Sequence, residues 1–539
     1  MNRYVAITAF VLLLIAYTSA SEAAVRLRVS QSPPWALPGE LFPVSVTVRA
    51  LNADGTVDKT YVDPVTLAIK EGTGTEGATI SGETVATPVE GIATFSELSI
   101  NRIGRGYVLI AASGALSADS QPFTVGSGQV LLWGRNNYGQ LGDGTNNNRN
   151  APAIHPALTT VTAVSAGHTH TLALKDNDSV WSFGYNLYGQ LGDGSTLTRT
   201  SPVQITNFTG VIALSAGEHH SMALKSDGTV WAWGYNGYGQ LGDGTTTERH
   251  TPVQVSGLTG ITAISAGGYH SLALKDDGTV WAWGNNWSGQ IGNGSEDDQY
   301  LPVQVSGIRT AVAISAGDSH SVILTDDGTV WAFGNNADYQ LGTSSVIYSD
   351  IPIAVSGVSG IKAVGAGNAH NLAVKTDGTE WAWGANGYYQ LGDGTTTKRF
   401  TPASLTGPAD IISTDAGYRH STALRKNGGV WAWGYNYYGQ LGDGTLTNRQ
   451  VPKLITSLTD ISCISAGGFH TAAIKMNLPV PFVWADVVTA LRVTAGLQTI
   501  NNVQFIRFDV EYTGASAARI DLHDVFRISR KVMGMEDNP

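Results

Sequence analysis

Seven histidines at regular spacing are the first residues of this chain that could do chemistry. Each lies three residues after the glycine of an Ala-Gly pair, and the period is 50 residues: His170, His220, His270, His320, His370, His420 and His470. Imidazoles are common zinc ligands, but zinc needs three or four donors about 2 Å from one point. Equivalent positions of a repeat lie on a ring instead. The spacing therefore predicts structural histidines that hydrogen-bond within a repeat or to the next one.

A glycine-rich loop with one carboxylate returns at the same period. It reads Gly-Gln-Leu-Gly-Asp-Gly-Thr at Gly139 and again at Gly239. A phosphate loop would need a following lysine and a helix N-terminus, and an EF-hand calcium loop would need several acids and a later glutamate. Two copies carry Asn293 and Thr343 in place of the aspartate. We interpret the loop as scaffold whose glycines permit a tight turn.

The elements that would position these residues are short strands. From His270 the chain alternates apolar and polar residues, turns at Asp-Asp-Gly, and resumes at Val280. This is the pattern of a hairpin, and two further short strands complete each repeat. Four strands per repeat, repeated seven times between Val130 and Lys475 without insertion, predict a β-propeller.

The ends of the repeat array predict that the ring closes. The array opens with the second half of a hairpin at Val130 and finishes with the first half, which begins at Ile464. Together the two halves make one more blade, and their pairing removes sheet edges that invite aggregation. An open solenoid is the alternative.

The repeat unit resembles a known family. It reads A-G-x-x-H-[ST]-x-A-L-K, then V-W-A-W-G-x-N-x-x-G-Q-L-G-D-G-T, and is similar to the regulator-of-chromosome-condensation repeat. The resemblance implies a seven-bladed propeller. Kelch and WD signatures are missing.

Binding residues are expected where the repeats differ. The pair before each histidine varies, and so does the segment after each aromatic-Gly pair. We predict a partner-binding surface from the aromatic residues of that segment, since exposed tyrosine and tryptophan on loops are typical of protein-binding sites. These residues are Tyr185, Tyr235, Trp287, Tyr435 and Tyr437. Packing between blades is the alternative, because further tyrosines recur in register from Tyr138 to Tyr438.

The N-terminus predicts export. Residues 1–23 contain Arg3, an apolar run from Val5 to Ala16, and small residues up to Ala23, as in a secretory signal peptide. An uncleaved anchor is the alternative. We expect a secreted or cell-surface protein without a membrane span in the mature chain. Cys463 is the only cysteine, so an intramolecular disulfide is impossible.

Two flanking regions differ in sequence pattern from the repeats. Residues 24–125 hold short alternating strands with Gly and Asp turns, predict a β-sandwich, and resemble bacterial immunoglobulin-like domains. Residues 477–539 contain D-V-x4-R-x3-G twice, at Asp486 and Asp524, and resemble a degenerate dockerin-like module with two helices.

The dockerin resemblance implies a cohesin-like partner and a calcium site. One degenerate loop offers the carboxylates Asp509, Glu511, Asp521 and Asp524, which could hold one Ca²⁺. A plain two-helix anchor without calcium is the alternative.

The expected fold is mainly β: a seven-bladed propeller over residues 126–476, with an N-terminal β-sandwich and a small C-terminal α-helical module. The net charge of −11 argues against a nucleic-acid partner, and no catalytic motif is found, so we predict a protein that is not an enzyme. The interpretation is an exported binding or scaffold protein with a protein partner of unknown identity. A component of a dockerin-linked polysaccharide-degrading assembly and a guanine-nucleotide exchange factor are the alternatives, although export speaks against the second.

Overall fold

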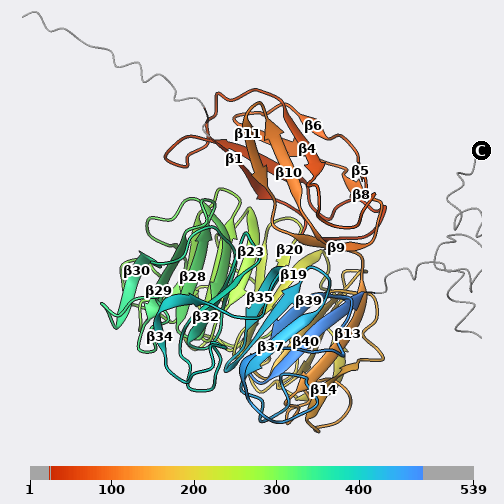
Figure 1. Ribbon diagram of the computed structural model, residues 1–539, viewed down its shortest axis with the longest axis vertical. Helices are drawn as coiled ribbons and strands as arrows, with labels where there is room; N and C mark the ends of the chain where they lie inside the picture. The colour runs from red at the N-terminus through yellow and green to blue at the C-terminus, as the bar shows by residue number, and fades with distance from the viewer. Residues whose placement is uncertain (1–23, 25, 477–539) are drawn as a thin grey trace, which may run out of the picture. The chain divides into compact units, whose positions relative to one another are not determined.

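The computed structural model describes residue 24 and residues 26–476, and every regular element in this part of the chain is a β-strand (Figure 1). The predicted mainly β class is confirmed for these residues. The predicted signal peptide and the predicted helical module of residues 477–539 lie outside the described residues. No helix in the described part is long and apolar enough to cross a membrane.

Six consecutive groups of four antiparallel strands, here called blades 1 to 6, follow one another along the chain, and a single pairing of Gly128 with Val161 joins the first group to the sheet of the chain ends. Blades 1 and 2 consist of β15 (Val161–Ala166), β16 (His170–Lys175), β17 (Val180–Gly184), β18 (Arg199–Gln204), β19 (Val211–Ala216), β20 (His220–Lys225), β21 (Val230–Gly234) and β22 (Arg249–Gln254). Blades 3 and 4 consist of β23 (Ile261–Ala266), β24 (His270–Lys275), β25 (Val280–Gly284), β26 (Gln299–Gln304), β27 (Ala311–Ala316), β28 (His320–Thr325), β29 (Val330–Asn335) and β30 (Tyr348–Ala354). Blades 5 and 6 consist of β31 (Ile361–Ala366), β32 (His370–Lys375), β33 (Glu380–Gly384), β34 (Arg399–Ser404), β35 (Ile411–Ala416), β36 (His420–Arg425), β37 (Val430–Gly434) and β38 (Arg449–Leu454).

The two ends of the array form blade 7. Its strands are β39 (Ile461–Ala466), β40 (His470–Met476), β13 (Gly128–Gly134) and β14 (Arg149–Ile154). Strand β13 pairs antiparallel with β40 in unbroken register, from Gly128 opposite Met476 to Gly134 opposite His470 (Figure 1). The split hairpin therefore closes as its sequence predicts, and the first and last strands of the array hold each other.

The hydrophobic core lies between adjacent blades. The second strand of a blade is buried along almost its whole length, because both faces of the sheet are covered by neighbouring blades. Leu272 and Leu274 of blade 3, for example, share one cluster with Ile323 and Phe333 of blade 4. Each blade is thus stabilised by the next, and blade 1 by blade 7.

Removal of the closing strand tests this dependence. Deletion of residues 128–144 removes the strand paired with β40. It also removes Trp133 and exposes the core cluster of Leu441 to which Trp133 belongs. We expect a drop in the thermal unfolding midpoint of well over 10 °C, since loss of several buried side chains costs on the order of 5 kcal/mol or more. Circular dichroism melting measures it. Deletion of the exposed residues 146–147 is the control, and equal melting of both deletions would contradict the closure.

The repeated histidines join each blade to the next. The Nε2 atom of His270 lies 2.9 Å from Ser321 Oγ in blade 4, and that hydroxyl donates to the carbonyl of Gln290 at 2.8 Å. The hydroxyl hydrogen is therefore committed, so its oxygen accepts the Nε2–H of the histidine. The same bond recurs around the ring and closes between His470 and Thr171 at 2.9 Å; blade 5 substitutes Asn371 for the hydroxyl.

Burial keeps these imidazoles neutral. The pKa of His270 is lowered to about 3, first by desolvation and then by its neighbours His320 and His220. A neutral ring with one N–H matches the single acceptor that the next blade presents.

A second ring of bonds runs beside the first. Ser165 Oγ accepts the backbone N–H of Ala216 in the next blade at 2.9 Å, and the same bond recurs at most junctions. Blade 5 has Gly365 in place of the serine and cannot supply the acceptor. Asp415 takes the serine position in blade 6: one carboxylate oxygen accepts its neighbour Ala416 N–H at 2.9 Å, and the other accepts Ala466 N–H at 2.8 Å. The aspartate therefore compensates for the acceptor that blade 5 lacks.

The glycine three residues before each histidine is required by close packing rather than by backbone conformation. A Cβ atom at Gly267 would lie 2.5 Å from both the Gly317 carbonyl oxygen and His270 Cε1. The next blade and the imidazole occupy the space that any side chain would need. The spacing Ala-Gly-x-x-His is therefore one structural unit.

Gly267→Ala should destabilise the propeller by about 2–4 kcal/mol, because backbone and a fully buried ring must both shift. Gly387→Ala is the matched control, since nothing lies within 4 Å of a Cβ there and neither glycine has a positive φ. Denaturant unfolding of both variants measures the difference, and equal stability would refute the steric argument.

One blade carries a buried acid at a core position. Glu380 stands where the other blades have valine, such as Val330 and Val430, and its side chain is fully buried. Thr414 Oγ1 donates to Glu380 Oε1 at 2.7 Å, and Lys362 supplies a favourable charge. Desolvation nevertheless dominates and raises the pKa of Glu380 to about 8.

Glu380→Gln should stabilise the protein increasingly as pH rises from 5 to 8. In that window the folded chain keeps a proton that the unfolded chain has released, so the parent loses stability as pH rises. The gain should reach on the order of 4 kcal/mol at pH 8. Melting curves across this range measure it, with Glu83→Gln at an exposed site as the control. Parallel pH profiles of parent and Glu380→Gln would disprove the assignment.

The N-terminal strands have a core of their own. It contains Val46, Val48, Phe95, Tyr107 and Leu109. Three of the sheets run in the orders β1-β3-β7, β11-β10-β4-β6 and β2-β12-β9, and β5 pairs with β8. The strands are β1 (Arg26–Gln31), β2 (Trp35–Ala36), β3 (Val46–Leu51), β4 (Val65–Ile69), β5 (Ile80–Ser81), β6 (Val85–Ala86), β7 (Ile92–Phe95), β8 (Ser99–Ile100), β9 (Gly104–Tyr107), β10 (Leu109–Ser113), β11 (Leu116–Asp119) and β12 (Phe123–Val125). Their resemblance to an immunoglobulin-like sandwich stays a prediction.

These N-terminal strands bond to one end of the blades. Arg28 donates to the carbonyls of Asp276 and Arg309 at 3.1 and 3.2 Å, and Trp35 Nε1 donates to the Ile212 carbonyl at 3.0 Å. Desolvation lowers the pKa of Arg28 to about 10. Asp276 begins the turn between the second and third strands of blade 3, which is at the opposite end of the strands from the Ala-Gly-x-x-His turns.

Candidate recognition face

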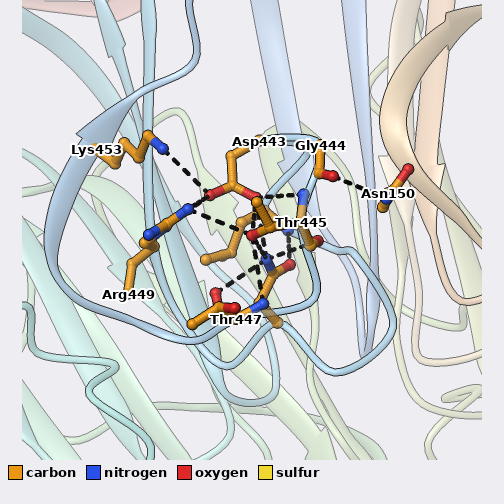
Figure 2. A network of polar contacts seen from close by, with 9 residues as sticks. Asn150, Asp443, Gly444, Thr445, Thr447, Arg449 and Lys453 are labelled. Atoms are coloured by element: carbon orange, nitrogen blue, oxygen red, sulfur yellow. Dashed lines mark hydrogen bonds and ion pairs between the residues drawn. The ribbon is translucent and has the colours of Figure 1, made fainter.

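The Gly-Asp-Gly loop is an internally bonded support, as its sequence indicates. In blade 6, Asn436 Nδ2 donates to Asp443 Oδ1 at 3.2 Å, and Asp443 accepts from Thr445 and from Arg449 Nε at 2.6 Å (Figure 2). Lys453 adds an ion pair at 3.6 Å. Both oxygens of the carboxylate are thus used by the loop and by strand β38, as expected for a structural residue rather than a metal ligand.

This support holds one loop residue of each blade in place, and that residue is tyrosine in every blade except blades 3 and 4, which have Ser288 and Asp338. The side-chain oxygen of Gln440 accepts the backbone N–H of Tyr438 at 3.1 Å, and Asn436 Oδ1 accepts that of Leu441 at 2.9 Å. The same pair of bonds recurs in the other blades, for example at Tyr188 and Gln190. A rigid loop therefore presents the residue four positions after the aromatic-Gly pair.

The aromatic side chains touch one another across blade boundaries and form what we call the aromatic arc. Ring centroids are 4.9 Å apart between Tyr138 and Tyr185, 5.0 Å between Tyr188 and Tyr235, and 5.1 Å between Tyr388 and Tyr435. The members of the arc are Tyr138, Tyr185, Tyr188, Tyr235, Tyr238, Tyr269, Trp287, Tyr388, Tyr435, Tyr437, Tyr438 and Phe469.

Arg135 joins the two halves of the arc. Its guanidinium carbon lies 5.4 Å from the Tyr138 ring, 5.2 Å from the Tyr438 ring and 5.9 Å from the Phe469 ring. Arg419 lies over the Tyr388 ring at 4.2 Å. Such cation–π contacts fix the rings without burying them completely.

All five predicted binding residues belong to the arc. Tyr185, Tyr235 and Tyr435 are half-buried against neighbouring rings, whereas Trp287 and Tyr437 are 68% and 65% exposed. The structure thus combines the two interpretations, because the same residues pack between blades and present an aromatic surface. Their role in partner binding stays a prediction. The predicted calcium ligands Asp509, Glu511, Asp521 and Asp524 lie outside the described residues.

The arc does not complete the circle. Blades 1 and 2 each carry two tyrosines, one and four residues after the glycine of the aromatic-Gly pair. Blade 4 has Asn335 and Asp338 at these positions, and blade 5 has Ala385 at the first and Tyr388 at the second. The face is therefore asymmetric, because these positions are aromatic in blades 1 and 2 and small or polar in blade 4.

A cavity of about 100 Å³ lies inside the arc, on the axis of the ring. It is lined by the Ala-Gly pairs and by the first residue after each pair. That residue differs in character from blade to blade: His168, Glu218, Gly268, Asp318, Asn368, Tyr418 and Gly468.

The charged groups of this axial cavity are poorly neutralised. Glu218 Oε1 lies 3.6 Å from His168 Nδ1 and 3.7 Å from His219 Nε2, but burial lowers the pKa of both imidazoles to about 4. Desolvation, then the Asp318 charge, raises the pKa of Glu218 to about 7. Within the described residues, no group of three or more His, Cys, Asp or Glu is arranged to hold a metal ion.

The axial residues are visible in the sequence only as variability. The pair before each histidine differs between repeats, but Glu218 and Asp318 lie 100 residues apart and nothing in either repeat predicts that they share one cavity. Arg135 and Arg419 also lie at variable positions, but the sequence does not predict their contacts with Tyr438 and Tyr388, because those rings belong to other repeats.

Comparison with known families supports the repeat assignment. The model described as the regulator of chromosome condensation (RCC1) repeat matches residues 127–174, 177–224 and 227–274, and the RCC1-like domain matches residues 257–484. The ring is therefore an RCC1-like propeller built of RCC1 repeats, as the repeat unit predicts.

Solved structures agree on the fold. Yeast RCC1 (Prp20) bound to Kap60 is 26% identical, with a TM-score of 0.60, over 66% of this chain and 90% of that one. Prp20p from Saccharomyces cerevisiae, whose study included binding to Gsp1p and histones, is 25% identical with a TM-score of 0.59, over 65% of this chain and 92% of that one. Human WBSCR16 shares the fold: it is 21% identical with a TM-score of 0.60, over 65% of this chain and 100% of that one.

Curated relatives match over shorter stretches. The human E3 ubiquitin-protein ligase HERC2 is 32% identical over 116 residues, and mouse Protein RCC2 is 38% identical over 78 residues. These stretches are 21% and 14% of this chain. The chain spans 2% of the ligase and 15% of RCC2.

Proposed function

We propose that this protein is an exported, non-enzymatic binding protein whose propeller holds a protein partner on the aromatic arc. The observation that carries the proposal is the continuity of the arc across blades 5, 6, 7, 1, 2 and 3 on one face. Tyrosine and tryptophan give large contact areas at low entropic cost, which is why they dominate protein-binding surfaces.

Within the unit Met1–Met476, the N-terminal strands leave the aromatic arc uncovered, which favours this face as the binding surface. The N-terminal strands bond to the turns at the other end of the blades, through Arg28, Trp35 and an ion pair of Arg49 with Asp276 at 2.5 Å. A partner therefore finds the aromatic end free of the N-terminal strands β1 to β12.

Relatives with the same fold support a role in protein binding. Yeast RCC1 was solved with Kap60, and Prp20p was studied for its binding to Gsp1p and histones. We infer the same general role, a propeller that engages another protein, for this chain. Export rests on the pattern of residues 1–23, and docking to a cohesin-like partner, with or without calcium, rests on residues 477–539; both stay predictions.

Matched bait variants of the full chain test the proposal. Trp287→Ala with Tyr437→Ala removes the two most exposed rings of the arc, and Tyr300→Ala with Phe400→Ala removes comparable rings from outer strands. We expect a protein captured from the organism's secreted fraction to lose at least about 2 kcal/mol of binding free energy with the first pair only. Quantitative affinity capture measures this.

Two results would count against the arc. Retention of every captured protein by the Trp287 and Tyr437 variant would show that the arc is only packing. Loss with the outer-strand variant instead would move the binding surface to the rim of the blades. Equal melting temperatures of the variants show that folding is preserved.

A further inference from the structure

The axial cavity contains two carboxylates with no cation beside them. Among the described residues, the only basic side chains within ion-pair distance of Glu218 are His168 and His219, which are neutral, and Asp318 forms no ion pair. The hydroxyl of Ser319 donates to Asp318 Oδ2 at 3.2 Å, and Tyr269 hydrogen-bonds to Glu218. Asp443, by contrast, is paired with Arg449.

Two tyrosines lie near these carboxylates. Desolvation, and then the charges of Glu218 and Asp318, raise the pKa of both Tyr269 and Tyr418. The Tyr418 ring lies 5.3 Å from the His168 ring, and the Tyr269 ring lies 6.1 Å from the His219 ring, between centroids. Carboxylates beside aromatic faces are the surroundings in which proteins hold ammonium and guanidinium groups. This same face already does so with its own side chains, since Arg419 lies against Tyr388 and Tyr418 and Arg135 against Tyr438.

The size of the cavity fits such a group. Its volume of about 100 Å³ exceeds the roughly 10–15 Å³ of probe volume that one water requires. Its walls are the Ala-Gly pairs of all seven blades and the residue after each pair. The cations at the rim, Arg135 and Arg419, are engaged by tyrosine and phenylalanine rings.

We propose that the axial cavity is a binding site for an organic cation, with Glu218 and Asp318 as the charge partners and the rings of Tyr269 and Tyr418 near them. The cation is a free amine or guanidine, or the arginine or lysine side chain of a docked protein. This inference deepens the proposed recognition face but rests on the axial groups alone, so it can fail or hold independently of the arc.

Binding should depend on pH through Glu218. A bound cation favours the ionised carboxylate, which the empty cavity disfavours, so affinity should rise as pH increases from 6 to 8. The imidazoles His168 and His219 are already neutral in this range, and Tyr269, whose pKa is also raised, stays protonated.

Calorimetric titration of the full chain tests the site with four probes. Methylguanidinium and the capped peptide Gly-Arg-Gly carry the cation, and methylurea and the capped peptide Gly-Gln-Gly are the neutral matches. We expect the cationic probes alone to bind, and to lose about tenfold or more in affinity in the Glu218→Gln, Asp318→Asn variant. The control variant, Glu248→Gln with Asp338→Asn, alters carboxylates outside the cavity and should bind like the parent.

The outcomes separate the two sources of the cation and the two proposals. Binding of methylguanidinium supports a free ligand, and binding of the arginine peptide alone supports a side chain presented by a protein. No binding of either cation at about 10 mM, or equal binding by the Glu218 and Asp318 variant, overturns the site. If the arc variant loses its partner while the cations do not bind, the proposed function stands and this inference falls.

Discussion

The hydrogen bond from each ring histidine to the next blade is the interaction on which the rest of the structure depends. His270 reaches Ser321, Ser321 reaches the backbone of Gln290, and the chain of bonds continues through every blade until His470 meets Thr171. Because all of these groups are buried, none can be lost without leaving a polar atom unsatisfied. The residue three positions before each histidine must be glycine, because the imidazole and the next blade fill the space that a side chain would need.

This constraint separates the parts of the repeat that must stay the same from the parts that can change. Histidine, glycine, asparagine and glutamine hold the blades and loops together and recur in every copy. The first residue after each of these glycines lines the axial cavity and ranges from glycine to tyrosine. The aromatic arc occupies the other free positions. The variable positions on which the proposed recognition face depends therefore lie at one end of the strands, where variation does not disturb the core.

Much of this architecture could be predicted from the repeat itself. The period, the hairpin pattern and the split ends indicated a closed ring of blades, and the lone carboxylate of each Gly-Asp-Gly loop indicated a scaffold. The partners of the histidines could not be predicted in detail, because each bond joins residues 51 positions apart in different blades. Nor could the cation–π links of Arg135, whose rings belong to three separate segments.

The candidate site was only partly accessible to the same reasoning. Tyr185 and Trp287 could be named because aromatic residues on loops are typical of binding surfaces, but their packing against neighbouring rings depends on the angle between blades. Glu218 and Asp318 are two ordinary acids in the sequence, and only the symmetry of the ring brings them to one axis. The burial of Glu380 likewise follows from coverage by the neighbouring blade, which no local pattern around that residue reveals.

The strict 50-residue register has a consequence for how such a chain can diversify. Each blade offers the next the same histidine donor and receives from the previous one at the same acceptor position. Recombination between two copies in register therefore exchanges whole sectors of the ring and leaves every seam with a donor and an acceptor. The axial residue and the arc residues of each blade are exchanged together with that blade. The surface that meets a partner can then be reassembled from existing pieces, while the bonds that hold the ring closed are inherited unchanged.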